Sequence, residues 1–255
     1  MRPITTFATA ALLLGICSAA PAQQGAYMAP AGTPANIRRA VESSARSAEQ
    51  TTRDAGRKPA EVLTMAGIDD GDEVIEFGAF GHYYSTMLVE AVGPSGHVYM
   101  VDMPWVEPFG GEAARAFDAA HANASFMQVD YNEMELPDGA DAALMILFYH
   151  DTSREAADET VDTADMNARI FDALAPGGTF LVIDHVAAAG SGWGAAQTLH
   201  RMDPATIIDE VTAAGFELVT NSDLLSMPAD DHTLNIFDPA IRGMTDRALL
   251  VFRKP

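Results

Sequence analysis

Glu76-Phe77-Gly78-Ala79-Phe80-Gly81-His82 is the stretch of sequence that decides the fold. It begins at the end of an apolar run at residues 73–77, which is typical of a short β-strand bounded by glycines. A helical pattern at residues 82–92 follows and is stopped by Gly93-Pro94. A strand that passes through a glycine-containing turn into a helix is the first half of a βαβ unit, so this stretch predicts a parallel sheet.

The same alternation continues along the rest of the chain. Strand patterns lie at residues 97–101, 124–129, 142–148, 179–183, 216–220 and 248–252, and helical patterns at 59–65, 111–120, 163–174 and 203–215. The run at 142–148 is apolar without a break, which is typical of a strand buried on both faces. We therefore expect an α/β fold with a doubly wound, mostly parallel, seven-stranded Rossmann-like sheet. A long polar stretch at about 226–246 is expected to form a lid or short structure of its own.

Three segments are expected along the chain. Residues 1–22 resemble a signal peptide, because Arg2 and a short apolar run precede a small-x-small pattern at Ala20 and Ala22. Residues 23–56 are expected to be a flexible leader and an N-terminal helix that starts at Thr33-Pro34. Residues 57–255 are expected to form one domain. Cleavage after Ala22 would place the protein in the periplasm or outside the cell.

Composition narrows the classes of partner. The 255 residues carry a formal net charge of −21, which disfavours nucleic acid and anionic membrane surfaces as partners. Cys17 is the only cysteine, and it lies inside the expected signal peptide, so a mature chain would have no disulfide. No other stretch is apolar and long enough to span a membrane. A small-molecule substrate is the expected partner, and the sequence leaves the oligomeric state open.

Acidic residues stand at the carboxyl ends of five predicted strands: Glu76, Asp102, Asp130, Asp151 and Asp184. Ligands of open α/β sheets bind beyond these strand ends. The glycine turn carries no basic residue, so a pyrophosphate would find no positive partner there. The pattern therefore disfavours a dinucleotide and favours a cationic, phosphate-free nucleoside ligand.

These residues resemble the class I S-adenosylmethionine-dependent methyltransferases over about residues 57–255. The string Leu174-Ala175-Pro176-Gly177-Gly178 is similar to the one that precedes the fifth strand in that family. Other strings resemble a bacterial group of exported predicted methyltransferases: Arg57-Lys58-Pro59, Tyr149-His150-Asp151, Leu199-His200-Arg201, Ala214-Gly215-Phe216 and Arg242-Gly243-x-Thr245-Asp246.

The resemblance implies S-adenosylmethionine as the cofactor and assigns roles to residues. Glu76 and Gly78 would line the methionine end, Asp102 would hold the ribose, Met103 would pack on the adenine and Asp130 would meet its amino group. The full implied cofactor-binding set is Glu76, Gly78, Ala79, Phe80, Gly81, Asp102, Met103, Asp130 and Tyr131. The turn departs from the family pattern at two glycine positions, where Phe80 and His82 stand instead. A phenyl ring at Phe80 either blocks the cofactor or points away from it.

His150 is the expected general base, because it follows the fourth strand and titrates near neutral pH. Asp151 is expected to orient it or to act directly. Expected substrate-facing residues are Tyr149, His185, Trp193, His200 and Arg201. No metal is expected in the main hypothesis, although Asp151, Asp184 and His185 are a conceivable ligand set for a divalent ion.

The favoured function is methyl transfer from S-adenosylmethionine to a small or medium-sized acceptor. One alternative is a non-catalytic exported ligand-binding protein on a degenerate methyltransferase scaffold, suggested by the altered glycine turn. Another alternative is a metal-assisted hydrolase.

Overall fold

The computed structural model describes residues 27–154 and 159–255. The expected signal peptide at residues 1–22 and the first part of the leader lie outside the described residues. Among the described residues, none of the helices combines the length and the apolar character needed to cross a membrane.

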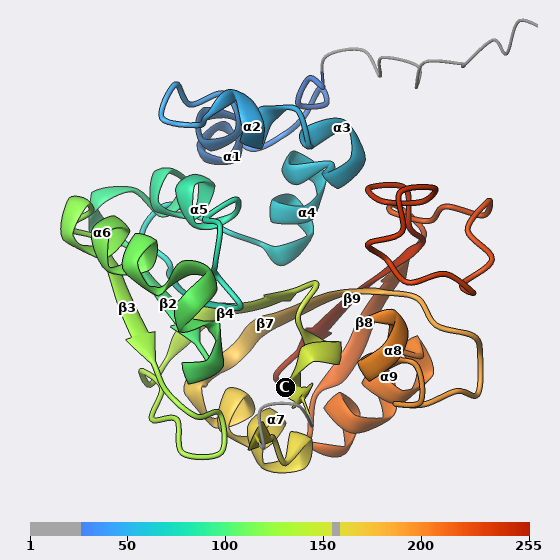
Figure 1. The fold of residues 1–255 in the computed structure, drawn as a ribbon. Helices are drawn as coiled ribbons and strands as arrows, with labels where there is room; N and C mark the ends of the chain where they lie inside the picture. The colour runs from blue at the N-terminus through green and yellow to red at the C-terminus, as the bar shows by residue number, and fades with distance from the viewer. Residues whose placement is uncertain (1–26, 155–158) are drawn as a thin grey trace, which may run out of the picture.

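A seven-stranded sheet forms the centre of the molecule, in the order β3-β2-β1-β4-β7-β9-β8 (Figure 1). Its strands are β1 (Glu73–Phe77), β2 (His97–Asp102), β3 (Ala124–Gln128), β4 (Ala140–Ile146), β7 (Leu174–His185), β8 (Glu217–Ser222) and β9 (Arg247–Arg253). All neighbours pair in parallel except β9, which is antiparallel to both β7 and β8. The predicted fold class is confirmed.

Helices cover both faces of this sheet (Figure 1). One face carries α4 (Pro59–Ala66), α5 (Ser85–Val92) and α6 (Glu112–Ala120), and the other carries α7 (Thr163–Ala173) and α9 (Pro204–Ala213). Two apolar cores result, one containing Leu88 and Val89 of α5 and the other containing Ile170 of α7 and Val211 of α9. Shorter elements are α8 (Ala196–Leu199) and the hairpin of β5 (Ser153–Arg154) and β6 (Glu159–Thr160).

The helix expected from Thr33 to about residue 53 is broken into three: α1 (Ala35–Val41), α2 (Ala48–Thr51) and α3 (Asp54–Arg57). Thr33 does not cap α1, because its hydroxyl donates back to the Pro30 carbonyl. Ser47 starts a new helix through a capping box with Gln50, and this local signal interrupts the longer pattern.

Other boundaries differ less. The helix expected from His82 begins at Ser85, because His82 adopts a left-handed backbone conformation with φ +49°. The fifth strand starts at Leu174 rather than at residue 179. Its Pro-Gly-Gly segment is drawn into the sheet by hydrogen bonds from Gly177 N–H to the Lys254 carbonyl and from Lys254 N–H to the Gly178 carbonyl.

A buried ion pair fixes the N-terminal helices in place. The Arg46 guanidinium donates to both oxygens of Asp54, at 2.8 and 2.6 Å, and both side chains are buried. The Tyr83 hydroxyl donates to the same carboxylate at 2.6 Å. Helix α1 packs on α5 through Ile37 and Val41, which belong to the same apolar core as the sheet residues. The arm is therefore held by both polar and apolar contacts.

Replacing Asp54 by alanine should lower the free energy of unfolding by about 3–5 kcal/mol, because it leaves a buried guanidinium without its partner. Glu42→Ala is the matched control, since Glu42 pairs with Arg38 at the surface and such pairs contribute less than about 1 kcal/mol. Chemical denaturation of the two variants measures the difference. Equal losses would show that the Arg46–Asp54 pair does not anchor the arm.

Candidate functional site

A cavity of about 550 Å³ lies at the carboxyl ends of the central strands β1, β4 and β7. This volume is in the usual range for small-molecule sites. Glu76 and the glycine turn line one side, His150, Asp151 and His185 line another, and residues of the arm and of the 236–247 segment complete the wall. The long polar stretch expected to form a lid thus does reach the cavity, through Ile236 and Phe237.

The glycine turn keeps left-handed backbone positions despite its altered sequence. Gly78, Gly81 and His82 have φ values of +68°, +87° and +49°. At Gly78 the absence of a side chain is required, because a Cβ there would lie 2.5 Å from Cγ of Phe148. The space above this glycine is therefore filled by an aromatic ring of the protein itself.

A cluster of aromatic side chains packs against the glycine turn. The Phe148 ring is stacked on Trp105 at 5.7 Å and meets the edges of Phe80 and Tyr131 at 6.0 Å each. Phe148 and Tyr131 are fully buried, whereas 40% of Phe80 is exposed. Phe80 thus packs against Phe148, and it is the most exposed of these four rings.

Four residues of the expected cofactor set do not line the cavity. Asp102 is buried and accepts a hydrogen bond from the Ala79 N–H. The Met103 sulfur accepts one from the Tyr131 N–H, and the Tyr131 hydroxyl donates to the Val101 carbonyl. Asp130 accepts from the Asn132 N–H in a local turn. The structure brings Glu76, Gly78, Ala79, Phe80 and Gly81 to the cavity.

Two buried carboxyl oxygens in this region have no hydrogen-bond partner among the described residues: Oε2 of Glu76 and Oδ2 of Asp102. Burial raises the pKa of Glu76 to about 8, against the opposing effect of Ser85. Burial also raises the pKa of Asp102 to about 6, against the opposing effect of the Ala79 N–H. Both carboxyl groups therefore keep their proton to a higher pH than an ordinary carboxyl does, and each has one oxygen that can still form a hydrogen bond.

His150 is held in a fixed orientation just after β4. Leu147, with φ +58°, turns the chain at the strand end, and His150 lies on the short 3-10 helix Tyr149–Thr152. Its Nδ1 lies 2.7 Å from Oδ1 of Asp184, and its backbone N–H donates to Oδ2 at 2.8 Å. A carboxylate only accepts, so Nδ1 carries the proton, and Nε2 is the nitrogen that faces Asp151 at 3.5 Å. Asp184, not Asp151, therefore orients the imidazole.

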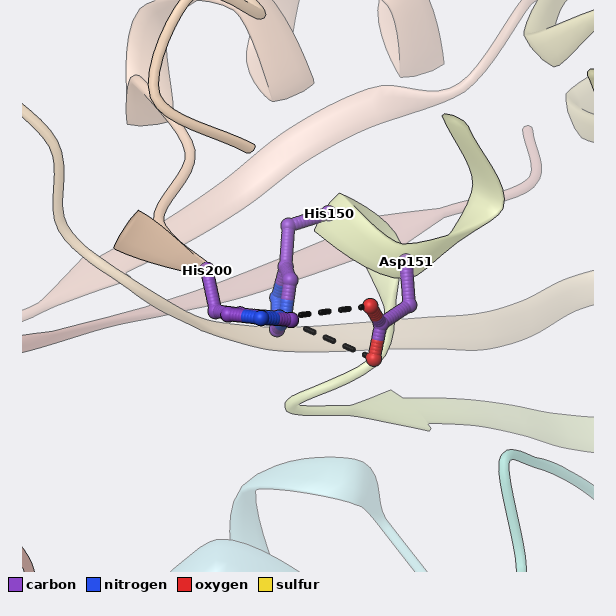
Figure 2. Close-up of side chains that lie close together, drawn as sticks. All are labelled: His150, Asp151 and His200. Atoms are coloured by element: carbon purple, nitrogen blue, oxygen red, sulfur yellow. Dashed lines mark ion pairs between the residues drawn. The ribbon is translucent and has the colours of Figure 1, made fainter. Parts of the chain in front are cut away.

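His200 approaches the same point from α8 (Figure 2), with Nδ1 3.5 Å from Oδ1 of Asp151. Ligand atoms of His150, Asp151 and His200 lie within 4.8 Å of one another, a donor set of the kind that binds divalent cations. The set conceived from the sequence is not assembled. The Asp184 oxygens bind His150 and backbone amides, and His185 Nδ1 hydrogen-bonds the Thr245 hydroxyl at 2.8 Å.

His185 lies beside His150, with ring centroids 6.1 Å apart. Burial depresses the pKa of His185 well below its ordinary value, and the neighbouring His150 and Arg247 act in the same direction. The ring is therefore neutral at physiological pH.

Of the five residues expected to face the substrate, His185 lines the cavity, and His200 contacts Asp151 without lining it. The other three lie elsewhere. Tyr149 and Trp193 are stacked and both donate to Glu210 of α9, which places them beside the helices of the other face. Arg201 is fully buried and binds both oxygens of Asp230, at 2.9 and 3.0 Å. It fastens the polar 226–246 stretch to the domain and is not exposed to a ligand.

Four arginines line the cavity that were not expected as site residues: Arg53, Arg57, Arg242 and Arg247. A signal for two of them existed, since Arg57 and Arg242 stand in strings that carried the family resemblance. Asp184 also gains a clear role, as the partner of His150.

Comparison with known proteins reveals only distant similarity. No protein-family model matches the sequence, and no curated protein matches it. Solved structures do match. A methyltransferase from Mesorhizobium loti that depends on S-adenosylmethionine aligns with a TM-score of 0.56 at 17% identity, covering 79% of this chain and 99% of that one. Aeropyrum pernix fibrillarin with natively bound S-adenosyl-L-methionine aligns with a TM-score of 0.50 at 16% identity, covering 78% and 76%.

The [4+2]-cyclase SpnF also aligns, with a TM-score of 0.54 at 22% identity, covering 84% of this chain and 85% of that one. The chain therefore has the class I methyltransferase fold. Since a protein described as a cyclase has a similar fold, the activity has to be argued from the site itself.

Replacing Glu76 by glutamine should change how stability depends on pH. Between about pH 4.5 and 8 the unfolded chain ionises this carboxyl while the folded protein keeps it protonated, so the wild-type loses stability as pH rises. Relative to wild-type, Glu76→Gln should gain up to about 1.4 kcal/mol per pH unit in this range. Denaturant titrations at several pH values measure it, with Glu112→Gln as the control for loss of one exposed carboxylate. Parallel curves for wild-type and Glu76→Gln would contradict the raised pKa.

Proposed function

We propose that this protein transfers a methyl group from S-adenosylmethionine to a small-molecule acceptor. One observation carries the proposal: a single cavity joins the glycine turn after β1 to the oriented His150 after β4. In a class I fold these two strand ends are where the two reactants would meet. The expected export of the protein is part of the proposal and is independent of this geometry.

The residues at the turn fit the cofactor in their chemistry. The unpartnered oxygens of Glu76 and Asp102 are buried acceptors that a ligand's ammonium and hydroxyl donors would satisfy. Glu76 and the Gly78–Gly81 turn would hold the methionine part, and Asp102 would hold the ribose. When bound, the cofactor supplies a methyl group on a cationic sulfonium centre.

His150 supplies the acid–base chemistry. Its Nε2 faces the cavity wall formed with Asp151. This nitrogen would accept the proton of an acceptor hydroxyl as the methyl group is transferred, or the proton of an acceptor ammonium before transfer, which frees the lone pair that attacks. The Asp184 carboxylate holds the ring in the required tautomer and stabilises the imidazolium that forms. Neutral His185 beside it adds no competing positive charge.

The closed aromatic cluster favours a second candidate, the non-catalytic ligand-binding protein. Asp102 is fully buried, and Phe148, Trp105 and Phe80 form a packed cluster at the glycine turn, so a nucleoside reaches that carboxyl only after side chains move. Phe80 is half-exposed and lies at the outside, which makes it the ring that has to move first. The two candidates therefore differ in one measurable property, cofactor binding.

Phe80→Ala should tighten binding of S-adenosylhomocysteine by about three- to tenfold, because the edge contact of Phe80 on Phe148 contributes about 0.5–1.5 kcal/mol to the closed state. Titration calorimetry on the full chain measures the affinities. Val219→Ala is the control, since Val219 is exposed on β8 and does not line the cavity. Absence of binding at millimolar ligand in both wild-type and Phe80→Ala would overturn the methyltransferase proposal and support the ligand-binding one.

His150→Gln should lower methyl transfer by about 10²- to 10⁴-fold while leaving cofactor affinity unchanged, because the base is lost and the turn is not. The measurement is transfer of a labelled methyl group from S-adenosylmethionine into small molecules of a cell-envelope extract. His97→Gln is the matched control, since His97 lies at the amino end of β2, whereas the cavity lies at the carboxyl ends of the strands. Undiminished transfer by His150→Gln would remove His150 from the reaction.

A further inference from the structure

Arginine side chains gather on one wall of the cavity. Arg53 and Arg57 come from the N-terminal arm, and Arg242 and Arg247 come from the chain leading into β9. The two groups are joined directly, because the Arg247 guanidinium donates to the Gly56 carbonyl at 2.6 Å. This grouping stands out in a chain with 15 basic and 36 acidic residues.

Two of these guanidiniums have unused donors in buried positions. Arg247 is only 7% exposed, and its Nε has no hydrogen-bond partner within the described part of the chain. The Nε of Arg53 is buried and unpartnered in the same way. Leaving a buried charged donor unsatisfied is costly, so such groups normally meet a partner.

Two carboxylates beside the wall, Asp54 and Asp246, are already engaged by other residues. Asp54, the acidic residue next to Arg53, binds Arg46 and Tyr83. Asp246, next to Arg247, accepts from the Met227 N–H and pairs with His232.

The positive charges of the arginines also repel one another. Burial lowers the pKa of Arg53 and of Arg247, and the positive charge of Arg57 lowers both further. Glu76, the carboxyl at the other side of the cavity, is mostly protonated at neutral pH, since its pKa is raised to about 8. An anion would relieve this repulsion and satisfy the donors together.

Two of the guanidiniums, those of Arg53 and Arg57, are held against an aromatic ring of the protein. The guanidinium carbons (Cζ) of Arg53 and Arg57 lie 5.1 and 4.6 Å from the centroid of the Tyr83 ring, in cation–π contact. Tyr83 is itself fixed by its hydrogen bond to Asp54. A guanidinium fork that is fixed in this way suits the planar or tetrahedral oxygens of a carboxylate or phosphate.

The arginine wall is also continuous with the proposed base. Arg247 of β9 pairs with His185 of β7 in the sheet register, and the His185 ring lies 6.1 Å from that of His150. A ligand whose anionic group rests on the arginines would extend along this row toward His150.

We propose that Arg53, Arg57, Arg242 and Arg247 form a binding site for the carboxylate or phosphate group of the methyl acceptor, which is therefore an acidic small molecule. The assignment to an acceptor rests on the proposed methyltransferase function, whereas the anion site itself does not. The cofactor's own carboxylate offers the same chemistry, and the experiment distinguishes the two.

Binding of inorganic phosphate and of citrate to the full chain is measured by titration calorimetry without cofactor. We expect binding to the wild-type and a loss of at least about tenfold in affinity in Arg57→Gln and Arg53→Gln. Arg57→Lys keeps the charge but loses the fork, so its affinity should fall between those of wild-type and Arg57→Gln. Arg115→Gln, a surface arginine paired with Glu107, is the matched control and should bind as wild-type does. Circular dichroism verifies that each variant is folded.

A second titration repeats the measurement with saturating S-adenosylhomocysteine. Unchanged anion affinity supports the acceptor assignment, and competition between the two overturns it in favour of the cofactor's carboxylate. No anion binding by folded wild-type protein overturns the site itself. A methyltransferase activity that survives this result would leave the proposed function standing, and anion binding without cofactor binding would leave only the anion site standing.

Discussion

The buried carboxylate of Asp184 is the interaction on which the arrangement of the site depends. At the end of β7 it receives the His150 backbone N–H and ring Nδ1–H from the segment after β4, together with the His185 N–H. A buried carboxylate has to be fully hydrogen-bonded, so it holds two neighbouring strand ends together and fixes one tautomer of His150. The hydrogen bonds of Asp184 thus fix the position of His150 in the cavity lining.

The fold followed from local patterns, because strand and helix periodicity in β1, α5 and β4 agrees with the final sheet. Side-chain placement did not follow in the same way. The structure places His150 and Asp151, which follow β4, in the cavity lining. Tyr149 follows the same strand, yet its hydroxyl donates to Glu210. The direction in which a side chain points after a strand end depends on the backbone turn that follows the strand. Here that turn contains Leu147 with φ +58°, a conformation that the sequence did not predict.

Long-range pairing is the other property that a linear pattern leaves open. Arg201 was expected to contact a ligand but pairs with Asp230, whereas Arg53 and Arg247 carried no sequence signal and both line the cavity. Whether a basic residue serves structure or ligand depends on the partners that the fold brings to it. The altered glycine turn is a second example. His82 keeps a glycine-like backbone, while Phe80 joins an aromatic cluster whose rings come from the four segments that follow β1, β2, β3 and β4.

The buried Arg201–Asp230 pair has a consequence for how molecules reach the interior. Asp230 also accepts the backbone N–H groups of His232 and Asp246, so both ends of the segment above the cavity are tied to one fully desolvated charge pair. Because the segment is held near both ends, we expect it to stay in place rather than to open and close over the cavity. The part of the cavity lining that Ile236 and Phe237 provide is therefore expected to keep its shape when a ligand binds.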